Sequence, residues 1–255
     1  MPMALAPAAA LAGLMGLVIG SFLNVVAYRL PRGESLAHPP SRCPGCGTPV
    51  KRRDNVPVLS WLVLGGKCRE CGTRISARYP LVEAGTAILA IAVVLVHGAD
   101  SDVWLPLTLL ALLVPIALID LDERIIPNKI VVPGSVLALV IGAIVDPSGI
   151  PEQLIAGAGA FTFLLLALLA YPAGMGEGDV KLAGMMGLYL GYEVGVALLF
   201  GLLSGAIVGA VIIARKGMAE GRKTAVPFGP FLAFGGVVAM LAGEPIVHWY
   251  THTFL

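Results

Sequence analysis

The chain has 255 residues, of which 57% are hydrophobic and only 13% are charged. Soluble domains carry about 25% charged residues, so this composition excludes an ordinary soluble domain and predicts a chain that crosses a bilayer. The formal net charge is +1, and ten of the 17 Lys and Arg residues lie between residues 29 and 78. Because apolar runs flank this basic stretch, it is interpreted as a topology signal rather than as a nucleic-acid-binding surface.

The N-terminal run carries no charged side chain before Arg29. A secretory signal peptide begins with a positively charged region ahead of its apolar core. Since that region is missing here, residues 1–28 are predicted to form an uncleaved first transmembrane helix with its N-terminus outside the cytoplasm.

A helix needs about 20 apolar residues to cross roughly 30 Å of hydrocarbon. The sixth and seventh predicted spans are divided at residues 191–193, because a single helix over 180–214 would be about 52 Å long. With this division every Lys and Arg falls on one side, and positive residues concentrate in cytoplasmic loops. We therefore expect an all-α polytopic membrane protein, a bundle of about eight transmembrane helices at residues 5–28, 81–97, 103–119, 129–145, 153–173, 180–191, 193–214 and 226–243.

Four cysteines form two C-x-x-C pairs, Cys43 with Cys46 and Cys68 with Cys71. Paired C-x-x-C units at about this spacing are typical of a tetrahedral zinc site. Two disulfides are the alternative, but cytoplasmic thiols stay reduced. Four thiolates leave no open position for water, so the metal is expected to be structural. Residues 29–80 are thus predicted to be a cytoplasmic zinc-ribbon-like module between the first helix and a membrane domain at 81–255.

Two acidic motifs lie at the same cytoplasmic level, IDLDERIIPN at residues 119–128 and GMGEGDVK at residues 174–181. Ionisable groups at membrane depth are costly to bury and therefore indicate function. Two carboxylates in a partly dry site can divide catalysis between them, one acting as acid and the other as the base that activates water.

Each acidic motif also has a structural interpretation. Asp179 is expected in the loop just before the sixth span, where it could cap the helix, and the first motif could be an ordinary juxtamembrane acidic cluster. Capping alone leaves unexplained why Gly174, Gly176 and Gly178 precede Asp179. Glycines at these positions would let a backbone or an extended substrate approach closely.

Several motifs in this order resemble those of the bacterial type IV prepilin peptidases, which are bifunctional leader peptidases and N-methyltransferases of the GxGD aspartyl protease class. Besides the cysteines, they are GSFLNVVAYRLP at 20–31, RYPLVE at 78–83, the motif at 120–128 and GEGD at 176–179. The resemblance implies that Asp120 and Asp179 are the catalytic pair, with Asp122 as the alternative for the first position. Gly176 and Gly178 are candidate substrate-binding residues, because glycine leaves room for an extended substrate.

The resemblance further implies the substrates and a methyl donor. Prepilins or pseudopilins, each a short basic leader followed by an apolar helix, would be cut after a glycine at the cytoplasmic face of the inner membrane. The new N-terminus would be methylated from S-adenosylmethionine, and the family points to Gly66 and Lys67 for this step. Asn24 and Glu83 are further candidates, since each lies about 7 Å inside a basic boundary residue. These two side chains could equally pair with each other.

Two other functions fit part of the sequence. A small ion-coupled transporter could use Asp120 and Asp179 as coupling carboxylates, but the outer halves of most predicted spans are almost entirely apolar. A non-enzymatic zinc-bearing component of a secretion assembly would account for the cysteines and would leave the aspartates without a role. Membrane lipid and prepilins are therefore the expected partners, and nucleic acid is not.

Overall fold

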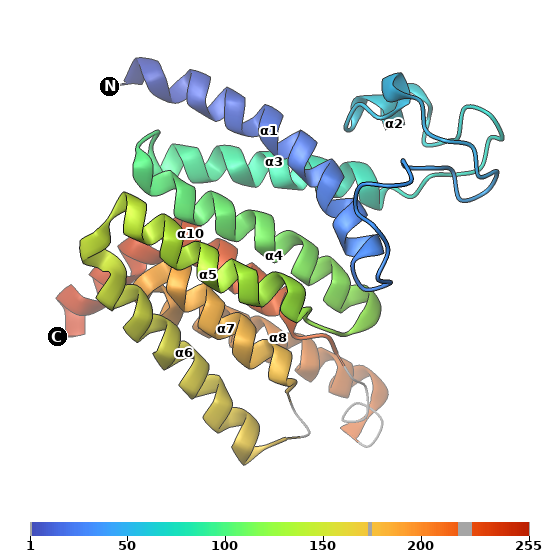
Figure 1. Cartoon of the computed structure of the whole chain (residues 1–255). Coiled ribbons are helices and arrows are strands. Elements are labelled where there is room, and N and C mark those ends of the chain that lie inside the picture. Colours follow the sequence, from blue (N-terminus) through green and yellow to red (C-terminus); the bar gives the residue numbers. More distant parts are fainter. Residues whose placement is uncertain (1, 173–174, 219–225, 255) are drawn as a thin grey trace. The chain divides into compact units, whose positions relative to one another are not determined.

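The computed structural model describes residues 2–172, 175–218 and 226–254. Gly174 of the glycine-rich motif, and residues 219–225 between the last two predicted spans, lie outside the described ranges. Helices make up nearly all of the regular structure in these ranges (Figure 1), and the β pairing there consists of two isolated bridges. The predicted all-α class is confirmed.

The chain divides into two compact units, residues 1–99 and 100–255. In the first unit α1 (Pro2–Arg29) packs along α3 (Arg78–His97). A methyl group at Gly20 would lie only 2.9 Å from the Cα atom of Glu83. The lack of a side chain at Gly20 therefore lets the two helix backbones approach closely, as is common where helices pack in a membrane.

Between α1 and α3 lies the cysteine-containing segment, with a 3-10 turn η1 (Arg52–Asp54) and a short helix α2 (Leu59–Val63). The rest of this segment is held by turns and by the two β-bridges, Arg42 with Pro49 and Lys67 with Arg74. So little regular structure leaves no sizeable apolar core, which is why small modules of this kind depend on a metal or a cross-link.

The second unit is built around α7. This helix contacts α4, α5, α6, α8 and α10, and its Leu182 and Met186 are fully buried. The helices and 3-10 turns of the unit, in chain order, are η2 (Ser101–Val103), α4 (Trp104–Glu123), α5 (Asn128–Val145), η3 (Pro147–Gly149), α6 (Ile150–Ala170), α7 (Glu177–Leu190), η4 (Gly191–Glu193), α8 (Val194–Lys216) and α10 (Gly229–Phe254).

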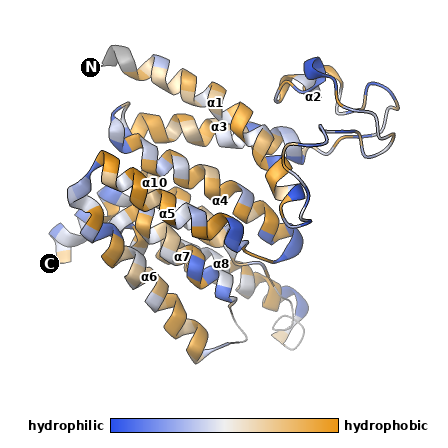
Figure 2. Ribbon diagram, in the orientation of Figure 1, coloured by the Kyte–Doolittle hydropathy of each residue, from blue (hydrophilic) through white to orange (hydrophobic). Residues whose placement is uncertain are grey.

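Seven helical stretches within the described residues are long and apolar enough to cross a membrane. One of them, Glu177–Lys216, has 40 residues and contains the turn η4, where Gly191 takes a φ of +55°. This turn ends α7 and begins α8, at the position where the sequence predicts a division into two spans. Figure 2 shows these helices as mainly hydrophobic, with hydrophilic residues gathered towards helix ends and in the cysteine segment.

Several predicted boundaries differ from the observed ones, and two of the differences matter most. The last span is predicted to end at residue 243, but α10 continues through Pro245 to Phe254. Asp179 was expected in a loop, but α7 begins at Glu177 and includes Asp179 in its first turn. The predicted span begins only at residue 180, where the apolar run starts. It therefore omits the first turn of α7, which contains the acidic residues Glu177 and Asp179.

Candidate active site and cysteine cluster

Asp120 lies in the last turn of α4 and is buried, with only 5% of its surface exposed. It continues the stripe of Leu109, Leu113 and Ile116, which are all buried and which recur at the helical spacing. The Oδ2 atom of Asp120 accepts a hydrogen bond of 2.8 Å from the N–H group of Gly229. Gly229 is the first residue of α10, and the N-terminus of a helix favours a negative charge.

Asp122 is exposed, in contrast to Asp120. Two residues along a helix correspond to a rotation of about 200°, so Asp122 points away from the stripe that carries Asp120. Its exposure supports Asp120 over Asp122 as the carboxylate of the buried site.

Asp179 is also buried, with 7% of its surface exposed. Its Oδ2 atom accepts a hydrogen bond of 3.0 Å from the N–H group of Gly176, the residue that precedes α7. Asp179 thus takes part in starting the helix, although from inside the first turn and not from the capping position. The neighbouring Glu177 is exposed and lies 3.8 Å from Lys181, so it is not part of the buried pair.

The start of α7 packs against the segment that follows α4. A methyl group at Gly178 would lie 2.8 Å from Cβ of Ile126, so this glycine allows the chain's own backbone to come close. Gly176 has room, since the nearest atom to such a methyl group would be Oδ2 of Asp179 at 3.4 Å. α7 contacts both α4 and α10, the two helices that hold Asp120 and its hydrogen-bond donor Gly229. The packing of α4, α7 and α10 therefore brings two buried carboxyl groups into one site, which is the arrangement that acid–base hydrolysis needs.

Gly229 is a member of this site that the sequence analysis missed. A methyl group on it would lie 2.8 Å from Oδ2 and 3.2 Å from Cβ of Asp120, so a larger residue would displace the carboxylate. The available signal was Pro227-Phe228-Gly229-Pro230, where proline in the first turn marks a helix N-terminus. That signal predicts the start of α10 but not its partner, which lies 109 residues away in the sequence.

The four cysteines come together in the first unit. Their sulfur atoms all lie within 4.8 Å of one another, and the sulfurs of Cys43 and Cys71 are 3.7 Å apart. In a tetrahedral site with Zn–S bonds of about 2.3 Å, neighbouring sulfurs lie about 3.8 Å apart. None of the four forms a disulfide. The donor set and its spacing therefore fit a zinc ion.

Two matching hairpins bring the cysteines together. In the first, the N–H group of Cys43 donates to the carbonyl of Thr48 (3.0 Å) and that of Gly47 donates to the carbonyl of Cys43 (2.9 Å). The second hairpin repeats both bonds 25 residues later, from 43 to 68, 48 to 73 and 47 to 72, at 2.8 and 3.0 Å. Gly47 and its counterpart Gly72 both have a φ near +70°, which glycine adopts without steric cost.

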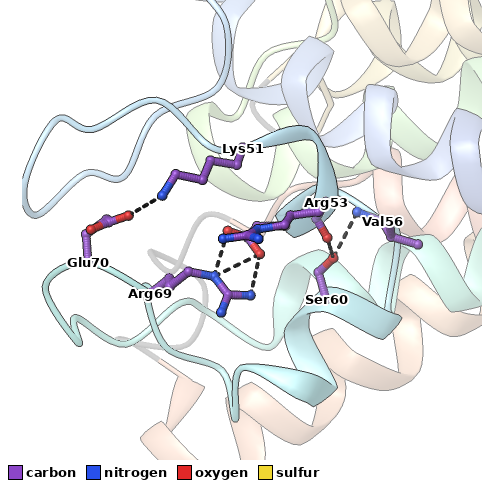
Figure 3. Close-up of polar contacts among 7 residues, drawn as sticks. Lys51, Arg53, Val56, Ser60, Arg69 and Glu70 are labelled. Carbon is purple, nitrogen blue, oxygen red and sulfur yellow. Dashed lines mark hydrogen bonds and ion pairs between the residues drawn. The ribbon is translucent and has the colours of Figure 1, made fainter.

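Two ion pairs join the residues that follow the first hairpin to the second hairpin (Figure 3). Lys51 contacts Glu70 at 2.7 Å, and Arg69 pairs with Asp54 at 2.6 Å. The guanidinium group of Arg69 holds the pKa of Asp54 below its usual range. Within the second hairpin, hydrogen bonds to the hydroxyl and backbone of Thr73 lower the pKa of Cys71 to about 6. A thiol with this pKa is readily available as the thiolate that a metal requires.

Three of the four residues expected at a methylation site are engaged by the chain itself. The side-chain amide of Asn24 donates to the carbonyls of Gly20 (3.2 Å) and Tyr79 (3.4 Å). Glu83 accepts a hydrogen bond from the N–H group of Val58 at 2.7 Å, so the described bonds of Asn24 and Glu83 run to backbone groups and not between the two side chains.

Gly66 is buried with a φ of +66°, and a methyl group on it would lie 2.8 Å from the ring of Trp61. Lys67, the next residue, is exposed. Gly66 therefore serves the packing of the hairpin, and Lys67 is the one of the four candidates with an accessible side chain.

Each of the two units contains a region that matches a known protein family. Residues 14–97 match the family described as the bacterial peptidase A24 N-terminal domain, and residues 107–214 match the type IV leader peptidase family. A prepilin leader peptidase/N-methyltransferase of Pseudomonas putida is 36% identical over 92% of this chain and 91% of its own length. A protein of the same description from Aeromonas hydrophila is 36% identical over 95% of this chain and 93% of its own length. No solved structure matches the chain. The chain belongs to the prepilin leader peptidase/N-methyltransferase family.

Proposed function

We propose that this protein removes the leader peptide of prepilins or pseudopilins as an aspartyl endopeptidase, with Asp120 and Asp179 as its catalytic residues. The observation that carries the proposal is the burial of both carboxyl groups in one site, at the end of α4 and the start of α7. A buried carboxylate is costly without partners, and each of these two receives a backbone N–H group.

In the proposed reaction, the two carboxyl groups share one proton and hold a water molecule between them and the scissile carbonyl. The ionised carboxylate accepts a proton from the water, whose oxygen attacks the carbonyl carbon. The protonated partner gives its proton to the carbonyl oxygen, forming a neutral tetrahedral diol. Collapse of the diol breaks the C–N bond. The proton taken from water passes to the leaving amine, and one hydroxyl of the diol returns its proton to the carboxylate that protonated the carbonyl oxygen, which leaves a carboxyl group on the product. The pair returns to its starting state without a metal or a covalent intermediate.

The substrate would present its cleavage site at the cytoplasmic border of the membrane, after the glycine that ends a basic leader. Every Lys and Arg of this chain lies on one side of the predicted spans, which supports a cytoplasmic location for the cysteine module and for the aspartates. The N-terminus would then lie outside, and the protein would reside in the bacterial inner membrane.

The proposal of a zinc ion and the proposal of S-adenosylmethionine as methyl donor rest on different observations. The four sulfurs fit zinc, which would hold the two hairpins together and leave no position for substrate. Methyl transfer from S-adenosylmethionine to the new N-terminus rests on the description of the relatives. Gly66 packs against Trp61, and Asn24 and Glu83 form hydrogen bonds with their own chain. These contacts do not favour the three residues as ligands of this cofactor, so no step of methyl transfer is assigned to them.

Co-expression of the protein with a tagged prepilin tests the proposed activity directly. Intact-mass spectrometry of the purified pilin is expected to show loss of the leader after its glycine, and a further mass gain of one methyl group where the second activity is present. A prepilin that keeps its full mass beside a well-expressed protein would contradict the peptidase assignment.

Replacing Gly229 by Ala is expected to lower the rate of leader removal by about 10- to 100-fold, because a small displacement of a catalytic group is enough for such a loss. The methyl group would push against Asp120 without changing its chemistry. Gly209→Ala is the matched control, since a methyl group there meets no atom within 4 Å. Initial rates with a prepilin peptide measure both variants, and equal rates would show that the contact between Gly229 and Asp120 does not matter.

A further inference from the structure

Residues 56–66 of the cysteine module are uncharged although they lie in the most basic part of the chain. Their sequence is VPVLSWLVLGG, with Arg52, Arg53 and Asp54 shortly before it and Lys67 directly after it. The carboxylate of Asp54 is paired with Arg69, so Arg52 and Arg53 keep their positive charge on this flank. Four apolar side chains on and beside α2 are exposed, with 44, 61, 60 and 81% of their surface free at Val56, Leu59, Leu62 and Val63. A cluster of this kind on a polar module marks a surface that another apolar phase covers.

The exposed face of α2 is held in a defined orientation. On the inner side, Nε1 of Trp61 donates to the carbonyl of Ile75 at 3.1 Å, and its ring lies over Gly66. The hydroxyl of Ser60 accepts a hydrogen bond of 2.9 Å from the N–H group of Val56. It donates one of 3.1 Å to the carbonyl of Arg53 in η1 (Figure 3). The apolar side chains therefore face outwards because the polar and aromatic ones are engaged within the module.

A contact with α3 sets the depth of α2. The N–H group of Val58, the residue before α2, donates to the buried carboxylate of Glu83 at 2.7 Å. Val58 has a φ of +62°, which is rare for a β-branched residue. Glu83 lies five residues after Arg78, where the membrane-spanning helix α3 begins, and so about 7.5 Å along the helix. Interfacial helices bury their apolar face to a depth of about 5–10 Å, so α2 begins at this depth.

We propose that residues 56–64 lie in the bilayer interface, with Leu59, Leu62 and Val63 among the acyl chains, and that the flanking basic residues bind anionic lipid headgroups. Two apolar partners could cover this surface, the lipid bilayer or the apolar helix of a prepilin. The basic residues beside it, Arg52, Arg53 and Lys67, favour the bilayer. A prepilin approaches with a basic leader, which Arg52, Arg53 and Lys67 would repel, whereas these residues attract an anionic leaflet. The proposal does not depend on the peptidase activity.

Photo-cross-linking tests this surface in the full-length protein. A benzophenone amino acid is placed at Val63 or, as a control, at Arg42, which is exposed beside the first cysteine pair. Each variant is reconstituted in nanodiscs of equal parts phosphatidylcholine and phosphatidylglycerol, irradiated with and without a synthetic prepilin peptide, and analysed by mass spectrometry. Both positions are exposed, so neither substitution disturbs packing, and an unchanged metal content verifies that the module is folded.

The Val63 variant is expected to form lipid adducts at least about tenfold above the Arg42 variant, as an inserted side chain should. Phosphatidylglycerol is expected to predominate in these adducts. Lipid adducts no more frequent than at Arg42, or adducts formed mainly with the prepilin peptide, would overturn the proposal. Equal shares of the two lipids would overturn the selection of anionic headgroups. Cross-linking requires no turnover, so an inactive enzyme would leave this result unaffected.

Discussion

Replacing either Asp120 or Asp179 by Asn is expected to reduce leader removal by about 10²- to 10⁴-fold, the range that a single acid or base contributes. The reason is specific to proton transfer. An asparagine carbonyl oxygen can still accept the N–H groups of Gly229 and Gly176 that Asp120 and Asp179 receive at 2.8 and 3.0 Å. The amide keeps the local structure and cannot carry the proton.

Asp122→Asn is the matched control for this prediction, because Asp122 lies two residues from Asp120 on the exposed side of the same helix. It is expected to cleave at close to the rate of the unchanged protein. Co-expression with a tagged prepilin, followed by gel and mass analysis of the pilin, measures all three variants. Full cleavage by both the Asp120 and the Asp179 variants would contradict the catalytic assignment. Asp179 would then only help to start its helix, and Asp120 would be part of an acidic cluster at the membrane boundary.

Removal of zinc is expected to unfold the cysteine module while leaving the helices of the second unit intact. Structural zinc contributes about 10–16 kcal/mol of binding free energy in small zinc-finger peptides, and this module has little apolar core to replace it. Ten Lys and Arg residues lie between residues 29 and 78, so trypsin reports its unfolding. We expect rapid cleavage in this stretch after treatment with a strong chelator, or in the Cys43→Ser variant.

Metal analysis of the purified protein accompanies the digestion, with one zinc per chain as the expected content. Adding back zinc should restore resistance to trypsin in the unchanged protein, whereas magnesium should not, since it prefers oxygen ligands. Resistance that survives complete loss of the metal would show that the hairpins and the contacts of Lys51 and Arg69 suffice by themselves.

Local patterns in the sequence predict most of the fold. Apolar runs predict the helices. The length of 35 residues predicts that the run 180–214 is divided, because it exceeds one crossing, and the distribution of Lys and Arg supports the division. The end of the last helix is predicted too early. Hydropathy places it at residue 243, after which polar residues become frequent, but the backbone of α10 remains helical through Pro245 to Phe254. The end of an apolar run is not a signal that ends a helix.

The site is less predictable than the fold because its contacts join residues far apart in the sequence. The spacing of the cysteines predicts their cluster, since each pair is local. The contact of Asp120 with Gly229 spans 109 positions, and the bond from Val58 to Glu83 spans 25. No local pattern encodes either one. The resemblance places Asp120 ahead of Asp122 in the acidic motif, and the face of α4 on which each lies gives the physical reason, since Asp120 is buried and Asp122 is exposed.

The most direct test of the catalytic pair compares binding and cleavage in the same purified samples. The affinity for an uncleaved prepilin and the single-turnover rate of its cleavage are measured for the unchanged protein and for the Asp120→Asn, Asp179→Asn and Asp122→Asn variants. The first two variants are expected to bind prepilin within a few-fold of the unchanged protein and to lose cleavage by at least about 10²-fold, while Asp122→Asn keeps both properties. Cleavage at the original rate, or a loss of cleavage explained entirely by lost binding, would contradict a catalytic role for the pair.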